Sequence, residues 1–359
     1  MSSPTTWQVG IIGYGFSAKI FHIPFIQHSP HFHLHAVVQR NPTFNNDVTA
    51  DFPGVVLYRT PDEIVQDPTL DIIIVTTPPD THFRLTKLVL EAGKHVVCEK
   101  PFTPTSAEAS ELATLATKQG KLLAVFQNRR WDSDFITVSN LIKTGTLGRI
   151  VEFETHYDRY QPKPTSTKSW KNQAMAGHGA IYDLGAHVLD QAVQLFGVPA
   201  RVTGVVGSQR EENPSGLEDA FTVLLHYAKG PLVTVKSSVL SAEEEQLRFW
   251  VRGEKGSFKK FHVDVQEDQL LAGMRPGDAG FGEESSERFG TLVTVADGKF
   301  SKAEYPTDKP PTYAAFYQTL ADALAGKGKP AASGEEARDV IRIIELARES
   351  SMLGTSLDF

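Results

Sequence analysis

A glycine-rich motif directly follows the first apolar run of the chain. The run Val9–Ile12 continues into Gly13-x-Gly15-x-x-Ala18. In such a motif the first glycine permits a tight turn, the second lets the main chain approach a pyrophosphate, and the small third residue lets a helix pack closely on the strand. The N-terminus of that helix attracts phosphate. The motif predicts dinucleotide binding, with cofactor contacts from Gly13, Tyr14, Gly15, Phe16, Ser17 and Ala18.

The end of the second apolar run bears on which dinucleotide is bound. Enzymes that use NAD usually place an Asp or Glu there, which holds the ribose 2′-hydroxyl. This chain has Gln39 and Arg40 instead. A guanidinium can hold a 2′-phosphate through two parallel hydrogen bonds, although a solvated surface arginine is the alternative interpretation. We expect Gln39 and Arg40 to contact the cofactor, and NADP to be preferred while NAD remains possible.

Two more motifs follow later apolar runs of the same region. They read Thr76-Thr77-Pro78-Pro79-x-x-His82 and Cys98-Glu99-Lys100-Pro101. Open α/β sheets bind ligands at the carboxyl ends of their strands, and a proline restricts the residue before it to an extended backbone. Lys100 is therefore suited to hold a substrate oxygen. The cofactor contacts predicted here come from Thr76, Thr77, Pro78, His82, Glu99, Lys100 and, further along, Asn128.

A carboxylate and an imidazole are spaced for one helix face in the second half of the chain. Asp183 and His187 are four residues apart in the predicted helix Ile181–Phe196. Such a pair can handle protons, but the spacing alone favours a helix-surface ion pair. The candidate catalytic residues are Lys100, Asp183 and His187, and the spacing does not decide whether His187 or Lys100 transfers the proton. The candidate substrate-binding residues are Lys100, Arg129, Trp131, Tyr157, Trp170, Asp183 and His187.

Short apolar runs alternate with helical segments over residues 8–127. The runs are apolar at successive positions, as in strands buried on both faces of a parallel sheet. We expect a doubly wound α/β Rossmann domain over residues 1–127. The predicted strands are Val9–Ile12, Leu34–Val38, Val55–Leu57, Ile72–Val75, Val96–Cys98 and Leu122–Phe126, and the predicted helices are Ala18–His28, Thr81–Ala92 and Ser106–Lys118.

The pattern changes to strict alternation in the second half of the chain. Residues 151–157, 221–227, 233–239 and 247–251 alternate with period two, which is typical of strands with one solvated face. Residues 133–143 and 335–353 have helical spacing. We expect an α+β domain over residues 128–359, with a large, open-faced, mostly antiparallel sheet. Because apolar residues such as Leu224 and Trp250 fall on the second face, we expect a homodimer through that face.

The motifs together resemble one enzyme family over essentially the whole chain. Gly13-x-Gly15-x-x-Ala18, Thr77-Pro78-x-x-x-His82, Glu99-Lys100-Pro101 and residues 177–187 resemble the glucose–fructose oxidoreductase/inositol dehydrogenase (Gfo/Idh/MocA) family. Residues 128–135 are similar to its NADP-dependent scyllo-inositol dehydrogenases. The resemblance implies hydride transfer between NADP(H) and a secondary alcohol or ketone of a cyclitol or sugar-like substrate, with Lys100, Asp183 and His187 as catalytic residues. The departures are small: Ala18 replaces a glycine, and His178 interrupts the glycine run.

Two other functions occur on the same fold and stay open as alternatives. Some members of the family bind the dinucleotide without turnover and regulate other proteins. Others hydrolyse glycosides while the cofactor is recycled on the enzyme. The first alternative predicts loss of Lys100 or His187, and both are present.

Composition excludes several classes of partner. The formal net charge is −7, which disfavours binding to nucleic acid or to an anionic membrane. The apolar runs are too short to span a bilayer. The chain has one cysteine, Cys98, which we expect to be buried. A single cysteine cannot form an intrachain disulfide, which favours the reducing environment of the cytoplasm. The histidines between His28 and His35 lack a nearby carboxylate or cysteine, so no metal site is expected.

Overall fold

The computed structural model of the chain describes residues 6–163 and 173–359. The described residues divide into two units. Unit 1 contains the chain up to Asn128 together with Asp268–Phe281 and Pro311–Arg338. Unit 2 contains Arg129–Glu267, Gly282–Pro310 and Asp339–Phe359. Unit 1 therefore includes two later segments that a single boundary after residue 127 leaves out.

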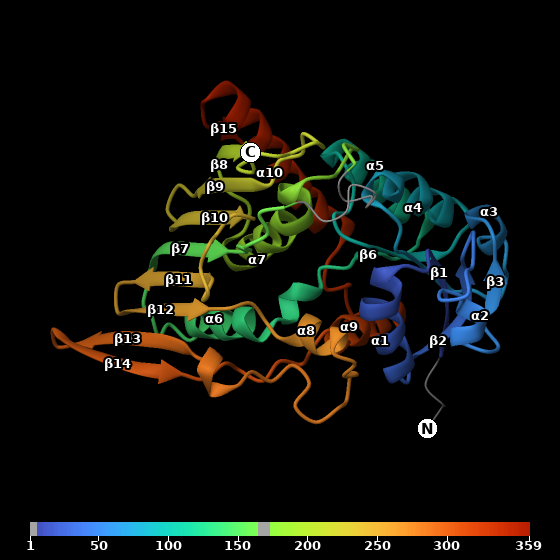
Figure 1. Cartoon of the computed structure of the whole chain (residues 1–359), viewed down its shortest axis with the longest axis horizontal. Helices are drawn as coiled ribbons and strands as arrows, with labels where there is room; N and C mark the ends of the chain where they lie inside the picture. Colours follow the sequence, from blue (N-terminus) through green and yellow to red (C-terminus); the bar gives the residue numbers. More distant parts are fainter. Residues whose placement is uncertain (1–5, 164–172) are drawn as a thin grey trace. The chain divides into compact units, whose positions relative to one another are not determined.

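Unit 1 is built on a parallel six-stranded sheet (Figure 1). Each of the six predicted runs forms a strand, and β4 is buried at every position, because helices cover both faces of such a sheet. The strand order is β3-β2-β1-β4-β5-β6, which is that of a Rossmann fold and confirms the prediction. The strands are β1 (Trp7–Ile12), β2 (Phe32–Val38), β3 (Val56–Tyr58), β4 (Ile72–Val75), β5 (His95–Cys98) and β6 (Leu123–Val125).

Besides the short helices α2, α3 and α8, unit 1 contains one longer helix that was not predicted from the sequence, α9. Its Phe316 and Tyr317 pack against Phe126 after β6, and Tyr317 stacks on Phe25 of α1 with ring centroids 6.1 Å apart. The segment before α10 also reaches this sheet, since the Val125 N–H donates to the main-chain oxygen of Ala332. The helices are α1 (Ile23–His28), α2 (Val48–Asp51), α3 (Pro61–Ile64), α4 (His82–Glu91), α5 (Ser106–Gln119), most of α8 (Gln266–Leu271), α9 (Ala314–Leu324) and the start of α10 (Gly334–Leu353).

Unit 2 is built on a nine-stranded sheet, with order β14-β13-β12-β11-β7-β10-β9-β8-β15. Its strands pair antiparallel except β7 with β10, which confirms the predicted fold class. The strands are β7 (Ile150–His156), β8 (Arg201–Gly207), β9 (Ala220–His226), β10 (Leu232–Ser238), β11 (Leu247–Gly253), β12 (Gly256–Phe261), β13 (Gly290–Ala296), β14 (Lys299–Tyr305) and β15 (Leu357–Asp358).

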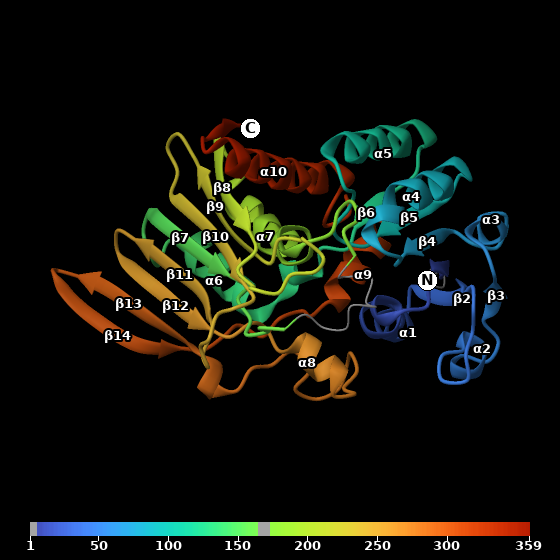
Figure 2. The same cartoon turned by 45° about the horizontal axis from the view of Figure 1, so that its top comes forward.

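Helices cover one face of this second sheet. Figure 2 shows α6 (Ser133–Lys143), α7 (Ala186–Phe196) and α10 on the same side of it. The helix α10 approaches β8 so closely that a Cβ at Gly204 would lie 2.1 Å from the main-chain oxygen of Ala347. The alternating residues Phe153, Val235 and Phe249 are buried beneath the helices, because period-two strands send successive side chains to opposite faces.

The predicted helices Ala18–His28 and Ile181–Phe196 both begin with a π-helical turn. These turns are Ala18–His22 and Ile181–Gly185, and regular α-helix follows each of them. Such turns are rare and occur frequently at functional sites. The first begins at Ala18, the last residue of the glycine-rich motif, and the second lies within residues 177–187 and carries Asp183. Among the helices of the described residues, none is long and apolar enough to cross a membrane.

Candidate active site

The glycine-rich turn in unit 1 has the geometry that a dinucleotide requires. Gly13 has φ +109°, and a Cβ there would lie 3.0 Å from Thr76 Oγ1, so both conformation and space require glycine. A Cβ at Gly15 would meet nothing within 4 Å, which leaves its main chain open to a ligand. Ala18 is fully buried at the start of the helix, as close packing demands. These residues fit a pyrophosphate at the helix N-terminus.

The side chain of Tyr14 belongs to a small polar group beside this turn. Its hydroxyl donates to Asp51 Oδ2 at 2.5 Å, and Lys19 Nζ lies 3.1 Å from the same oxygen. Burial and the Asp51 carboxylate raise the pKa of Tyr14. Phe16, by contrast, is exposed and packs edge-on against Phe21. Phe16 is thus available to a ligand, whereas the Tyr14 hydroxyl is already engaged.

Gln39 and Arg40 differ sharply at the end of β2. Gln39 is buried, and its amide donates to the main-chain oxygen of Asn46 at 2.6 Å and accepts from the Val48 N–H at 3.0 Å. Arg40 is exposed, and no described residue forms a hydrogen bond or ion pair with its guanidinium. The Gln39 side chain therefore shapes the loop, while the Arg40 side chain is available to an anion.

The loop after β4 is connected to the Lys100 loop by a buried histidine. The His82 ring is fully buried, with Nε2 2.8 Å from the Thr77 oxygen and Nδ1 2.8 Å from the Pro101 oxygen. Thr76 Oγ1 donates to the main-chain oxygens of Ile12 and Gly13 and so fixes the glycine-rich turn. The His82 ring is engaged by the protein, so its predicted contact with cofactor can only be indirect.

Glu99 joins the glycine-rich turn to Lys100. Its carboxylate accepts from Ser17 Oγ and from the Lys100 N–H, the latter at 2.9 Å, and it lies 3.0 Å from His22 Nε2. Burial tends to raise the pKa of Glu99, but the hydrogen bonds from His22 and Ser17 outweigh burial and lower it. His22 is fully buried, and its other ring nitrogen lies 2.8 Å from the Tyr317 hydroxyl. His22 was not among the predicted site residues.

In unit 2, the π-helical turn carries Asp183 and the first turn of α7 carries His187. The glycine run before them has positive φ at Gly177 and Gly179, which explains why glycine is needed there. His187 is nearly fully buried, and Asp183 is half-buried. The two residues therefore lie in one helical segment, as the spacing predicted.

Two hydrogen-bonded links hold α7 against the turn Asn128–Trp131. Arg130 makes a bidentate contact with Asp190, at 2.8 and 2.7 Å. Gln191 Nε2 donates to the main-chain oxygen of Arg129 at 2.7 Å. Bidentate Arg–carboxylate pairs are geometrically specific. The positions of Arg129 and of the helix that carries His187 are thereby coupled.

Tyr157 lies between two guanidinium groups. Arg129 and Arg159 lie over its ring, 5.0 and 5.1 Å from the centroid. Burial raises the pKa of Tyr157, and the two arginines oppose that shift. Arg129 is buried and donates to Asp132 and Glu267, whereas Arg159 is exposed and its charge also interacts with Asp183. Arg159 was not among the predicted site residues, although its place two residues after Tyr157 was a usable signal.

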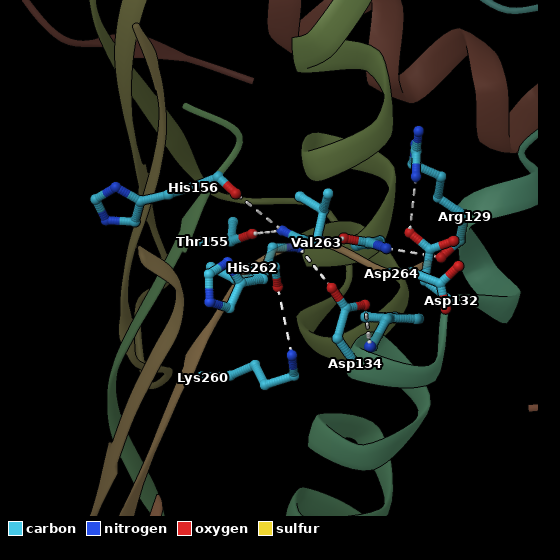
Figure 3. Close-up of polar contacts among 12 residues, drawn as sticks. Arg129, Asp132, Asp134, Thr155, His156, Lys260, His262, Val263 and Asp264 are labelled. Carbon is cyan, nitrogen blue, oxygen red and sulfur yellow. Dashed lines mark hydrogen bonds and ion pairs between the residues drawn. The ribbon is translucent and has the colours of Figure 1, made fainter. Parts of the chain in front are cut away.

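A buried group of aspartates supports these residues (Figure 3). Asp132, Asp134 and Asp264 are almost fully buried, and Arg248 donates to Asp134 at 2.9 Å and to Thr155 at 2.7 Å. Burial raises the pKa of Asp132 well above its ordinary range, and neighbouring carboxylates add to the shift that Arg129 opposes. Through Asp132, which accepts a hydrogen bond from Arg129, this group holds the Arg129 side chain in place.

The remaining predicted residues have mixed outcomes. Asn128 is buried at the start of its turn, and Trp131 is half-buried, with its main-chain oxygen accepting from Gln266. Trp170 lies outside the described residues. Cys98 is buried, as expected. Within the described part of the chain, no three histidine, cysteine or acidic residues are arranged to hold a metal ion.

Two family models match the chain. One is described as the NAD-binding Rossmann fold of an oxidoreductase family and matches residues 7–127, and the other is described as the C-terminal alpha/beta domain of that family and matches residues 139–359. The chain belongs to the Gfo/Idh/MocA oxidoreductase family. The resemblance found in its motifs is thereby confirmed.

Relatives in this oxidoreductase family span nearly the whole chain. An uncharacterized oxidoreductase of Schizosaccharomyces pombe is 40% identical, covering 98% of each chain. The scyllo-inositol 2-dehydrogenase (NADP(+)) IolW of Bacillus subtilis is 36% identical, covering 96% of this chain and 94% of its own. Among solved structures, an oxidoreductase from Bacillus cereus superposes with a TM-score of 0.88 at 31% identity, covering 99% of both chains.

Proposed function

We propose that this oxidoreductase prefers NADP and transfers a hydride between the nicotinamide and a secondary alcohol or ketone of a cyclitol or sugar-like substrate. The observation that carries the proposal is the setting of Lys100. Its main chain is anchored through Glu99 to Ser17 of the glycine-rich turn, so the backbone that carries the Lys100 side chain is held to the dinucleotide-binding turn. A lysine held in this way can donate to a substrate oxygen beside the bound cofactor.

The cofactor would be held by the glycine-rich turn and by the end of β2. Gly13 and Gly15 leave the main chain free to approach the pyrophosphate, and Arg40 is free for a 2′-phosphate. When bound, the nicotinamide supplies the hydride acceptor or donor. NADP is favoured because the end of β2 has no acid and because IolW, a relative at 36% identity, is named as an NADP(+) enzyme.

The protein side chains supply the proton chemistry. Oxidation of an alcohol releases the hydroxyl proton, and an imidazole that titrates near neutral pH is suited to accept it. We assign this role to His187 and assign to Lys100 the stabilisation of the substrate oxygen. Asp183 orients the imidazole or binds a neighbouring hydroxyl. A polyhydroxylated substrate suits the polar side chains Arg129, Tyr157 and Arg159, because hydroxyl groups need hydrogen-bonding partners when they leave water.

A cofactor-coupled screen tests the proposal. Purified protein is incubated with NADP⁺ or NADPH and a panel of inositols, aldoses and ketoses, and absorbance at the reduced nicotinamide band is followed. We expect turnover with at least one cyclitol or sugar, faster with NADP(H) than with NAD(H). Hydrolysis of glycosides without net change in NADPH would replace the dehydrogenase assignment. Cofactor binding without turnover of any of these compounds would favour a regulatory protein.

The open face of the second sheet is the proposed homodimer interface. Val205 is 70% exposed and Leu232 is 44% exposed on this face, which helices leave uncovered. Trp250 of β11 lies on the same face, separated from Leu232 by β7, and Arg252 and Lys259 lie over its ring. Apolar side chains between charged ones are typical of a surface that meets a second copy. The location in the cytoplasm, with no nucleic acid or membrane as partner, stays a prediction.

A further inference from the structure

Arg59 lies against the peptide bond that leads into Arg40. The strands β2 and β3 are parallel, with Val38 opposite Tyr58, so the residues after them reach the same edge of the sheet. The Gln39 N–H donates to the Tyr58 oxygen at 3.0 Å, and Arg59 Nη1 donates to the Gln39 oxygen at 3.2 Å. The carbonyl that Arg59 contacts therefore belongs to the peptide whose nitrogen is that of Arg40.

Both guanidinium groups are exposed at this edge. Arg59, like Arg40, lies on the surface, and its contact with the Gln39 oxygen is the one side-chain hydrogen bond that it makes to a described residue. That contact leaves most of its five N–H donors free. The Gln39 side chain does not compete for the space, because it is turned towards Asn46 and Val48.

Two carboxylates lie near Arg59, and main-chain N–H groups already engage them. Asp47 accepts from the Thr49 N–H at 2.9 Å and caps α2. Glu63 accepts from the N–H groups of Arg59 and Thr60, at 2.8 and 3.0 Å, and belongs to the capping box of α3. These acids moderate the positive charge of Arg59 without occupying its donors.

We propose that Arg40 and Arg59 together bind the 2′-phosphate of the dinucleotide, with Arg59 as a second specificity-determining residue. A phosphate offers three oxygens and close to two negative charges, which two planar guanidiniums can match. The ribose 2′-hydroxyl of NAD offers neither the charge nor the oxygens. This inference rests on the proposed preference for NADP and assigns part of it to a residue after a different strand.

Equilibrium binding of the full-length protein tests the inference without relying on turnover. Dissociation constants are measured by calorimetry for NADP⁺, NAD⁺ and two probes, 2′,5′-ADP and 5′-ADP. In the wild type we expect NADP⁺ and 2′,5′-ADP to bind more tightly than their unphosphorylated counterparts. Arg59→Ala should weaken both phosphorylated ligands by about 10- to 100-fold, the contribution of one charge-assisted hydrogen bond, with NAD⁺ nearly unchanged. The dissociation constants of Arg59→Lys for the phosphorylated ligands should lie between those of the wild type and of Arg59→Ala, because lysine keeps the positive charge but lacks the planar guanidinium.

Controls separate this inference from the proposed function. Lys118→Ala removes one exposed positive charge from the end of α5 and should change no dissociation constant appreciably. If the wild type binds NADP⁺ no better than NAD⁺, the proposed NADP preference fails. If the wild type prefers NADP⁺ and Arg59→Ala keeps the same preference, the preference stands and the role of Arg59 is wrong. If both Arg59 variants weaken the binding of NADP⁺ and NAD⁺ equally, the proposed role of Arg59 is also wrong, because Arg59 would then only shape the end of β2.

Discussion

The Nδ1 atom of His82 lies 2.8 Å from the main-chain oxygen of Pro101, the residue after Lys100. Its Nε2 atom lies equally close to the oxygen of Thr77. Because carbonyl oxygens only accept hydrogen bonds, both ring nitrogens must carry a proton to satisfy this arrangement, which requires the imidazolium form. Burial opposes that charge, but the adjacent Cys98 sulfur and the two carbonyls raise the pKa of His82 to about 9.

The first prediction is that His82 stabilises the fold in a pH-dependent way. A histidine in the unfolded chain titrates near 6.5, so the raised folded pKa gives a contribution that is complete below about pH 6.5 and is lost as the pH rises through about 9. The difference in unfolding free energy between the wild type and His82→Gln should shrink over this range by up to roughly 3 kcal/mol. Urea unfolding at several pH values measures it, and a constant difference would contradict the imidazolium assignment. In Cys98→Ala, the stabilisation by His82 should be lost at a lower pH, because the sulfur that helps to raise the pKa of His82 is absent.

Catalysis should depend strongly on Lys100 and His187. With a substrate found in the screen, Lys100→Met and His187→Ala should each lower kcat by at least about 10²-fold while the Kd for cofactor is largely kept. Asp183→Asn should cost less, or act mainly on KM. The rate of alcohol oxidation should rise with a single group between roughly pH 6 and 8. Near-wild-type turnover in both the Lys100 and His187 variants would remove the catalytic assignment.

A third prediction concerns Glu284, whose side chain is fully buried beside Lys260 in unit 2. Burial raises its pKa to about 7, and Lys260 opposes the shift. Between about pH 4.5 and 7 the folded state binds more protons than the unfolded state, so the unfolding free energy should fall as the pH rises. The wild type should lose up to roughly 3 kcal/mol relative to Glu284→Gln across this window. Glu283→Gln, at the neighbouring exposed position, should show no such trend.

The proposed homodimer predicts a defined sensitivity to charge on the open sheet face. The wild type should have the mass of a dimer by light scattering at micromolar concentration. Val205→Asp and Leu232→Asp should each favour monomers, because an unpaired carboxylate in an apolar interface loses its hydration. Leu271→Asp places the same charge at an exposed apolar position in unit 1 and should leave the mass unchanged. A wild-type monomer would rule out the interface.

The strands of unit 1 were predictable because burial on both faces gives unbroken apolar runs such as Ile72–Val75. In unit 2, β8, β12, β13, β14 and β15 were not among the predicted strands. The strand β14 gives no signal because its residues are exposed on both sides and lack apolar alternation. The helix α9 was also missed, since no motif distinguishes Ala314–Leu324 from other apolar segments. The spacing of hydrophobic residues predicts where a helix lies, but it does not predict a change in the hydrogen-bond pattern within the helix. The two π-helical turns could therefore not be predicted from the sequence.

The candidate site was predictable in its residue types and less so in its geometry. The position of Gln39 at the end of β2 suggested a cofactor contact, but only the structure shows that its amide is turned towards Asn46. Arg59 could be assigned to this site only from the register of β2 and β3, which cannot be derived from the sequence. Glu99 was assigned to the cofactor, and its link to His22 needed the fold, because the two residues are 77 positions apart.

The inclusion of α9 in unit 1 has a consequence for how the protein is made. The rings of Phe316 and Tyr317 cover Phe126 and His22, yet they are translated about 200 residues after β6, which is roughly 10 to 40 s of synthesis. During that interval Phe126 of the nascent Rossmann domain is uncovered, and His22 lacks the Tyr317 hydroxyl that contacts its ring in the complete fold. We expect the dinucleotide-binding unit to be completed only near the end of translation, and a fragment cut after residue 127 to aggregate when expressed alone.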